Sequence, residues 1–120
     1  MLNSKEVVMG QGLYSVMLCV QPDPNNADYI FVFIRARAVD EDSAALLFPA
    51  RIGGSTISVR SQFRSVKRLF IAGTSISESG RGLGFQSVKR DALPLFADKD
   101  GLVTIEASIQ IRPPVVIDLS

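Results

Sequence analysis

The side chains that could do acid–base or nucleophilic chemistry are few and scattered along this 120-residue chain. The sequence contains no histidine, which removes the commonest general base and the usual partner of a nucleophilic serine or cysteine. Asp91 and Glu106 do not make a credible acid–base pair, because Asp91 is placed to cap a turn and Glu106 lies on the polar face of a strand. We therefore expect no catalytic residues and no enzyme activity.

Cys19 is the only cysteine, so the chain cannot form an internal disulfide or, from cysteines alone, a zinc site. It lies in an apolar run and is predicted to be a small buried side chain. The alternative, a reactive thiol, requires exposure and a neighbouring positive group. Together with the absence of histidine, this composition predicts no metal site, and nothing in the sequence indicates a cofactor.

Phosphate-binding chemistry is indicated only weakly. The run Gly80-Arg81-Gly82-Leu83-Gly84 is rich in glycine, but a dinucleotide motif needs another spacing, a strand before it and a helix after it. Six basic residues form the richest basic set: Arg35, Arg37, Arg60, Arg64, Lys67 and Arg68. They either hold acidic or phosphate groups of a ligand or form a solvated face balanced by the acidic residues 40–42. A net charge of +1 predicts neither a nucleic-acid partner nor a membrane surface.

Length and composition predict one globular domain over residues 1–120. The hydrophobic fraction is 47% and the charged fraction 21%, which is ordinary for a folded domain with its own core. No apolar segment approaches the about 18 residues of a membrane helix, and residues 1–6 do not resemble a secretory leader. With a lone cysteine, this predicts an intracellular protein, cytoplasmic or nuclear.

The dominant hydrophobic period is two, which is typical of strands. One apolar row occupies the even positions of the segment 29–38: Ile30, Val32, Ile34, Ala36 and Ala38. A second row follows in the segment 102–111: Val103, Ile105, Ala107, Ile109 and Ile111. Gly53-Gly54 predicts a tight hairpin between strands at 46–52 and 55–63.

Short strands separated by turn residues predict an all-β fold, an antiparallel β-sandwich of about seven strands. The expected helix content is at most one short helix, near Val88–Leu93. Residues 1–9 and 113–120 are expected to be loosely ordered tails.

Several segments in order resemble MATH (TRAF-like) domains. Gly82-Leu83-Gly84-Phe85, the stretch 88–93 and the stretch 98–107 are similar to the C-terminal part of that family. The upstream stretches 20–34 and 46–52 resemble its earlier strands. The chain is divergent: the family's first strand is either missing or cut away, and Leu83 stands where the family has tryptophan.

This resemblance implies a β-sandwich that binds a short extended peptide, Ser/Thr-rich with an apolar anchor, in a surface groove. It also implies an adaptor or substrate-recognition module of the ubiquitin system or of receptor signalling. Carried over position by position, the peptide-binding residues are Phe33, Phe48, Arg81, Leu83 and Phe85. The alternation of residues 29–38 independently places Phe33 opposite the first apolar row, where it lies either in a binding patch or in a second buried face.

A second hypothesis is structural. Without the family's first strand, one sheet edge is open, so the chain could self-associate into a homo-oligomer or pair with a strand of another chain.

Overall fold

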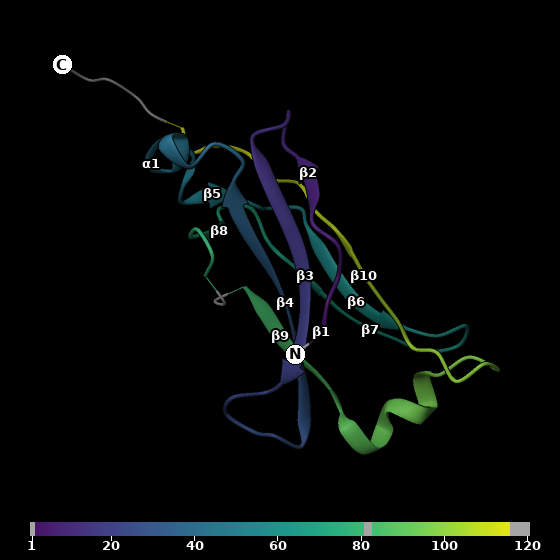
Figure 1. Cartoon of the computed structure of the whole chain (residues 1–120). Helices are drawn as coiled ribbons and strands as arrows, with labels where there is room; N and C mark the ends of the chain where they lie inside the picture. Colours follow the sequence, from purple (N-terminus) through teal and green to yellow (C-terminus); the bar gives the residue numbers. More distant parts are fainter. Residues whose placement is uncertain (1, 81–82, 116–120) are drawn as a thin grey trace.

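The structure, a computed structural model, describes residues 2–80 and 83–115 and consists mainly of antiparallel strands (Figure 1). The strands are β1 (Leu2–Asn3), β2 (Val7–Met9), β3 (Tyr14–Pro22), β4 (Tyr29–Ala38), β5 (Ala50–Arg51), β6 (Thr56–Arg60), β7 (Ser65–Leu69), β8 (Ser75–Ile76), β9 (Gly84–Lys89) and β10 (Thr104–Ser108). The helical segments are η1 (Glu41–Ser43), α1 (Ala44–Leu47) and η2 (Arg90–Phe96).

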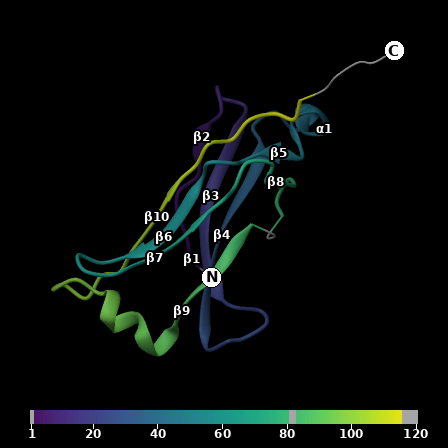
Figure 2. The ribbon, with the colours of Figure 1, turned by 180° about the vertical axis from the view of Figure 1, so that it is seen from behind.

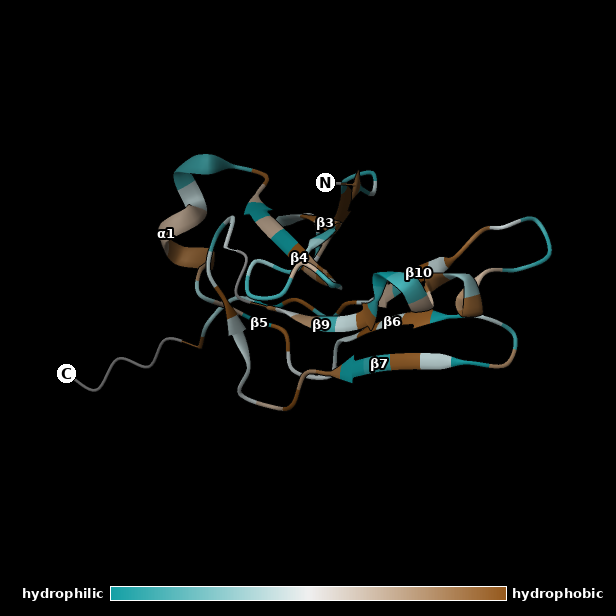
Figure 3. Cartoon of the chain, turned by 90° about the horizontal axis from the view of Figure 1, so that it is seen from below, coloured by the Kyte–Doolittle hydropathy of each residue, from teal (hydrophilic) through white to brown (hydrophobic). Residues whose placement is uncertain are grey.

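The strands form two main layers. The larger sheet has the order β1-β3-β4-β9, with β2 also paired to β3, and the smaller sheet has the order β10-β6-β7. A two-stranded ribbon of β5 and β8 lies at one end (Figure 2). Seen from below, β3 and β4 lie on one side of the molecule and β6 and β7 on the other (Figure 3). The predicted all-β, antiparallel, sandwich-like fold is confirmed, although the strands of the described residues number ten rather than about seven.

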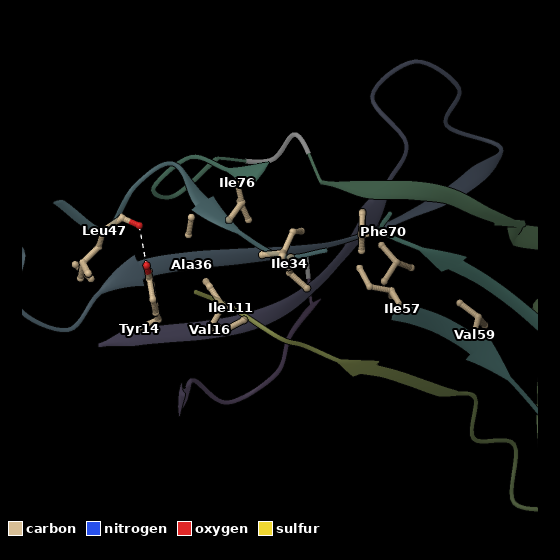
Figure 4. Packing of buried hydrophobic residues seen from close by; sticks show 14 of the residues in the cluster. Tyr14, Val16, Ile34, Ala36, Leu47, Ile57, Val59, Phe70, Ile76 and Ile111 are labelled. Carbon is tan, nitrogen blue, oxygen red and sulfur yellow. Dashed lines mark hydrogen bonds between the residues drawn. The ribbon is translucent and has the colours of Figure 1, made fainter. Parts of the chain in front are cut away.

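The core lies between these layers, as the period-two pattern predicts. On β4, Val32, Ile34 and Ala36 are fully buried, and they belong to the same cluster as Ile57 and Val59 of β6 (Figure 4). Burial of one side-chain row from each sheet is the main source of stability in such a fold.

Two short helical regions occur where the sequence predicts at most one. The segment before Gly53, predicted as a strand over 46–52, is helical up to Leu47. Asp40 explains the difference, because its carboxylate accepts hydrogen bonds from the amide of Asp42 (3.2 Å) and the hydroxyl of Ser43 (3.0 Å). The following Ala and Leu residues are strong helix formers. The second helical region, η2, overlaps the predicted helix at 88–93.

The predicted hairpin at Gly53-Gly54 is wrong, although a turn is present. The amide of Ser55 donates to the carbonyl of Ile52 (3.1 Å), and Gly54 has a φ of 90° that favours glycine. However, β5 pairs with β8 and β6 pairs with β7 and β10, so this turn joins two sheets instead of two paired strands.

The N-terminal segment is also more ordered than predicted. The sequence predicts a loose tail over residues 1–9, but β1 and β2 both pair antiparallel with β3. Between them, Ser4 exchanges hydrogen bonds with Leu18: the Ser4 amide donates to the Leu18 carbonyl (2.8 Å), and the Leu18 amide donates to the Ser4 hydroxyl (2.9 Å). The described C-terminal residues 113–115 contain no strand, and residues 116–120 of the predicted tail lie outside the described part.

Candidate functional site

The aromatic residues of the expected peptide groove do not lie on one surface. Phe33 pairs with Cys19 of β3 and Gly84 of β9, and its ring lies on the sheet face turned away from the main core. Leu83 and Phe85 pack against the main core instead, on the opposite face of the same sheet. The sheet therefore separates Phe33 from the Leu83–Phe85 pair.

Of the two remaining predicted groove residues, the structure describes only Phe48. Phe48 is partly buried beside α1 and packs edge-on against Tyr14, with ring centroids 5.5 Å apart. Arg81 lies outside the described residues.

Phe33 is a buried residue of a second, smaller apolar face. It has no exposed surface and stacks on Phe31 with ring centroids 5.4 Å apart. Cys19, its cross-strand neighbour, is also fully buried, and burial raises the pKa of its thiol. This burial agrees with the interpretation of Cys19 as a small apolar side chain and of Phe33 as part of a second buried face.

Three of the six members of the basic set are held by partners within the chain. Arg37 pairs with Glu6 (3.0 Å), and Arg60 pairs with Glu106 (2.6 Å). Arg68 donates to the carbonyl of Gly84, and its guanidinium lies 5.2 Å from the centre of the Phe70 ring. These arrangements fit a solvated face better than a single anion-binding patch.

The side of the sandwich between β2 and β10 is incompletely covered. β10 is the last strand of its sheet, and no strand among the described residues pairs with its outer edge. Its inward-facing Ile105 and Ala107 are only partly buried, whereas Ile57 and Val59 of the adjacent strand β6 have no exposed surface. The core is thus closed at β6 and still open at β10.

An apolar cleft of about 230 Å³ lies at this open side. Side chains of four strands, of the β1–β2 connection and of the segment just after β10 line it, and most of them are apolar. The lining residues are Ser4, Val7, Met9, Val16, Leu18, Ile34, Ile105, Glu106, Ala107 and Ile109. We call this cleft, together with the outer edge of β10, the β10 groove.

The hydrogen-bond pattern of the small sheet shows which β10 backbone groups face the groove. The Phe70 amide donates to the Ser55 carbonyl, and the Ser61 amide donates to the Arg64 carbonyl, so odd-numbered residues of β6 bond toward β7. Even-numbered residues of β6 therefore bond toward β10, where Ser58 is opposite Glu106. It follows that the N–H and C=O groups of Ile105 and Ala107 point away from β6, to the open edge.

The β10 groove combines two features, a strand edge with unpaired backbone groups and an apolar cleft beside it. A strand laid against β10 would meet unused backbone donors and acceptors, and its alternate side chains would face the cleft. The sequence pattern of 102–111 already indicates the apolar row of β10. The pattern does not predict which strands surround this row, because that depends on the order of the strands in the sheets.

No helix within residues 2–80 and 83–115 has the length and apolar character needed to span a membrane. In the same residues, no three histidine, cysteine or acidic side chains gather into a group that could hold a metal ion. Comparison with protein-family models, with curated proteins and with solved structures found no match to this chain.

Proposed function

We propose that this chain is a peptide-binding module that accepts an extended segment of another protein along the β10 groove. The observation that carries this proposal is the open edge of β10, with the half-buried Ile105 and Ala107 beside an apolar cleft. Exposed edges of this kind are hydrogen-bonding templates for another strand. Addition of one strand would complete the sheet and cover the exposed part of the core.

The surroundings of the groove define the chemistry of the ligand. Residues of the added strand that face inward would lie beside Ile105 and Ala107, which favours apolar side chains at every second position. Residues that face outward would lie beside the exposed side chains of Thr104 and Ser108 and beside Glu106, whose carboxylate is already paired with Arg60, which favours serine or threonine. The expected ligand is a Ser/Thr-rich segment with alternating apolar residues.

The resemblance to MATH domains supports the same class of function by a separate route. Its implied role is an intracellular adaptor that recruits substrates or receptors, with the ubiquitin system or receptor signalling as its setting. In this proposal the contact surface differs from the aromatic groove that the resemblance implies, because Phe33 and Phe85 lie on opposite faces of a sheet.

A titration of the ¹⁵N-labelled chain with the peptide Ac-Ser-Val-Thr-Val-Ser-Val-Thr-NH₂ tests the proposal. Saturable shifts of amide signals on β2 and β10 are the expected result. A peptide in which the three valines are replaced by serine controls for contacts that do not need the cleft. Shifts centred on Phe33 and Phe31 instead would move the site to the outer face of β4.

A pair of proline variants separates binding from folding. Ala107→Pro removes an N–H that points to the open edge, so peptide binding should fall while the pairing with β6 is kept. Glu106→Pro removes an N–H directed at β6 and is expected to destabilise the fold. Equal peptide affinity of Ala107→Pro and the unchanged protein would contradict strand addition at β10.

A second copy of the chain is the other polypeptide that could occupy this edge. The exposed Val7 and Val8 of the facing strand β2, 53% and 60% accessible, favour such contacts at high concentration. Light scattering after size-exclusion chromatography distinguishes the two cases. A dimer that Ala107→Pro dissociates would identify self-association as the use of the groove.

A further inference from the structure

One small residue interrupts the row of large apolar side chains on the inward face of β10. Valine or isoleucine occupies the other positions of this row, which are Val103, Ile105, Ile109 and Ile111. Ala107 lies in the middle of the row, and its side chain is at least two carbon atoms smaller than theirs. The apolar row therefore has a step at Ala107, where the inward face of β10 is set back from the opposite sheet.

The apolar cleft of the β10 groove lies at this step. Ala107 lines it together with its two neighbours in the row, Ile105 and Ile109. The cleft reaches Ile34 of β4 and Val16 of β3, which are 0% and 4% exposed, so it extends into the core. Its volume of about 230 Å³ is larger than the about 150 Å³ of an apolar protein cavity that takes up benzene. A space of this size accepts one large apolar side chain.

Among the described residues, two polar side chains line the cleft, and both are engaged within the chain. The Ser4 hydroxyl accepts from the amide of Leu18 (2.9 Å) and donates to the carbonyl of Lys5 (3.0 Å). The Glu106 carboxylate accepts from Arg60 Nε (2.6 Å). A hydroxyl, amide or charge brought into the cleft would lose its water without gaining a free side-chain partner, which is costly. The lining therefore favours an apolar occupant.

The backbone of β10 directs the side chain of an added strand to this step. The N–H and C=O groups of Ala107 point to the open edge, because the small sheet bonds through Glu106 and Ser108 to β6. A ligand residue directly opposite Ala107 would send its side chain to the same face of the sheet, with the two Cβ atoms about 4.5–5.5 Å apart. Met9 of the other sheet also lines the cleft, and a thioether sulfur makes favourable contacts with aromatic rings.

We propose that Ala107 is the specificity-determining residue of the β10 groove and forms the pocket for one phenylalanine side chain of the bound segment. This inference rests on the function proposed above, because strand addition along β10 is what places the side chain. The inward ligand residues on either side lie beside Ile105 and Ile109, whose larger side chains leave less space. The preferred ligand therefore carries phenylalanine at one inward position and smaller apolar residues two positions before and after it.

A peptide series tests the size and position of this anchor. Ac-Ser-Val-Thr-Phe-Ser-Val-Thr-NH₂ should bind the unchanged chain about tenfold more tightly than the peptide with three valines, since the larger side chain buries more apolar surface. Its ring protons should give nuclear Overhauser effects to the methyl group of Ala107. Ac-Ser-Val-Phe-Val-Ser-Val-Thr-NH₂, which carries the same ring on the outward face, is the matched control and should show no such gain. Equal affinities of the three peptides would overturn the proposal.

Enlargement of Ala107 tests its role directly. Ala107→Leu should fill the step and weaken binding of the phenylalanine peptide about tenfold or more. The midpoint of thermal unfolding should not fall, because the added side chain occupies apolar space that is empty in the free chain. Ala45→Leu, the same replacement at an exposed position of α1, should bind as the unchanged chain does. A folded Ala107→Leu variant with unchanged affinity for the phenylalanine peptide would contradict a pocket at this residue.

Toluene separates a failure of this inference from a failure of strand addition. It carries the ring without a peptide backbone, so it needs the cleft but not the edge of β10. Toluene should shift the methyl signals of Ala107, Ile105 and Met9 saturably in the unchanged chain. If toluene binds there and no peptide does, the pocket is confirmed and strand addition is wrong. If the valine-containing peptide binds along β10 while toluene does not bind and the phenylalanine peptide gains nothing, the pocket is wrong and strand addition stands.

Discussion

Phe33 and Phe85 lie on neighbouring strands of one sheet and project from opposite faces of it. The register places Phe33 opposite Gly84 and Val32 opposite Phe85, so the two aromatic side chains differ by one position in the alternation of the strands. Phe85 packs against the main core, and Phe33 is buried on the other face. A single-residue offset of this kind is enough to divide a predicted binding surface into two unrelated environments.

Truncation of Phe33 is predicted to lower stability rather than peptide affinity. Phe33→Ala should reduce the free energy of unfolding by roughly 3 kcal/mol, because a large side chain with no exposed surface is lost. Denaturant unfolding measures the change. Phe63→Ala is the matched control, since Phe63 is 88% exposed and its loss should have little effect. A stable Phe33→Ala variant with abolished peptide binding would favour the aromatic groove.

Gly84 is predicted to tolerate no side chain. A Cβ atom at this position would overlap the carbonyl oxygen of Val32 and the Cβ of Phe33 across the strand pair. Gly84→Ala should therefore destabilise the fold by about 1–3 kcal/mol through overpacking. Gly80→Ala, whose added Cβ would come no closer than 3.4 Å to its neighbours, is the control for thermal unfolding. Equal melting temperatures of the two variants would be inconsistent with the close β4–β9 contact.

The hydroxyl of Tyr14 is predicted to hold α1 against the core. It donates a buried hydrogen bond of 2.8 Å to the carbonyl of Leu47, the last residue of α1. Tyr14→Phe leaves this carbonyl without the donor and should cost about 1 kcal/mol. Denaturant unfolding measures the loss, and amide exchange of Phe48, whose N–H closes the helix, reports on α1 itself. Unchanged stability and exchange would show that the hydroxyl does not hold the helix.

The ion pair of Glu6 and Arg37 predicts a pH dependence at the N-terminal edge. Hydrogen bonds from the Arg37 guanidinium lower the pKa of the Glu6 carboxyl below its ordinary value of 4.5. Because the pKa of Glu6 is lower in the folded state than in the unfolded chain, its ion pair with Arg37 stabilises the fold at pH values above the unfolded-state pKa. This stabilisation is lost as the pH falls through the folded-state pKa. Both side chains are exposed, so salt should weaken the effect.

Carbonyl-detected NMR titration of the Glu6 carboxyl measures this pKa directly. Arg37→Gln should return it toward 4.5, and the stability difference between variant and unchanged chain should disappear in acid. A Glu6 pKa that Arg37→Gln leaves unaltered would show that the two side chains do not interact in solution.

The sequence predicts those parts of the fold that depend on local pattern. Alternation identifies the inward row of β4 and of β10, because a strand with one buried face needs apolar residues at every second position. It does not identify sheet order. The Gly53-Gly54 turn was predicted to join paired strands, yet β5 and β6 belong to different sheets. A turn signal specifies a change of direction and not the partner of the strand that follows.

The predicted site residues also show that local sequence pattern does not determine which other segments surround a side chain. Alternation correctly separates Phe33 from the Val32 row, but aromatic character alone does not distinguish a pocket from a second buried face. Capping is a further example: the Asp40 carboxylate favours helix at 41–47, whereas the apolar character of Leu46 and Leu47 predicts a strand. The cleft at β10 is lined by residues about 100 positions apart in the sequence, those of β2 and β10, and a local pattern cannot place such residues together.

Amide hydrogen exchange of Ile105 and Ala107, with the intervening Glu106 as internal reference, is the most direct test of strand binding at β10. In the free chain, Ile105 and Ala107 should exchange faster than Glu106, whose N–H is directed at β6. Saturation with the valine-containing peptide should slow both at least tenfold and leave Glu106 little changed. Amides of Ile105 and Ala107 that are already protected in the free monomer, or that the bound peptide leaves unprotected, would contradict strand addition in the β10 groove.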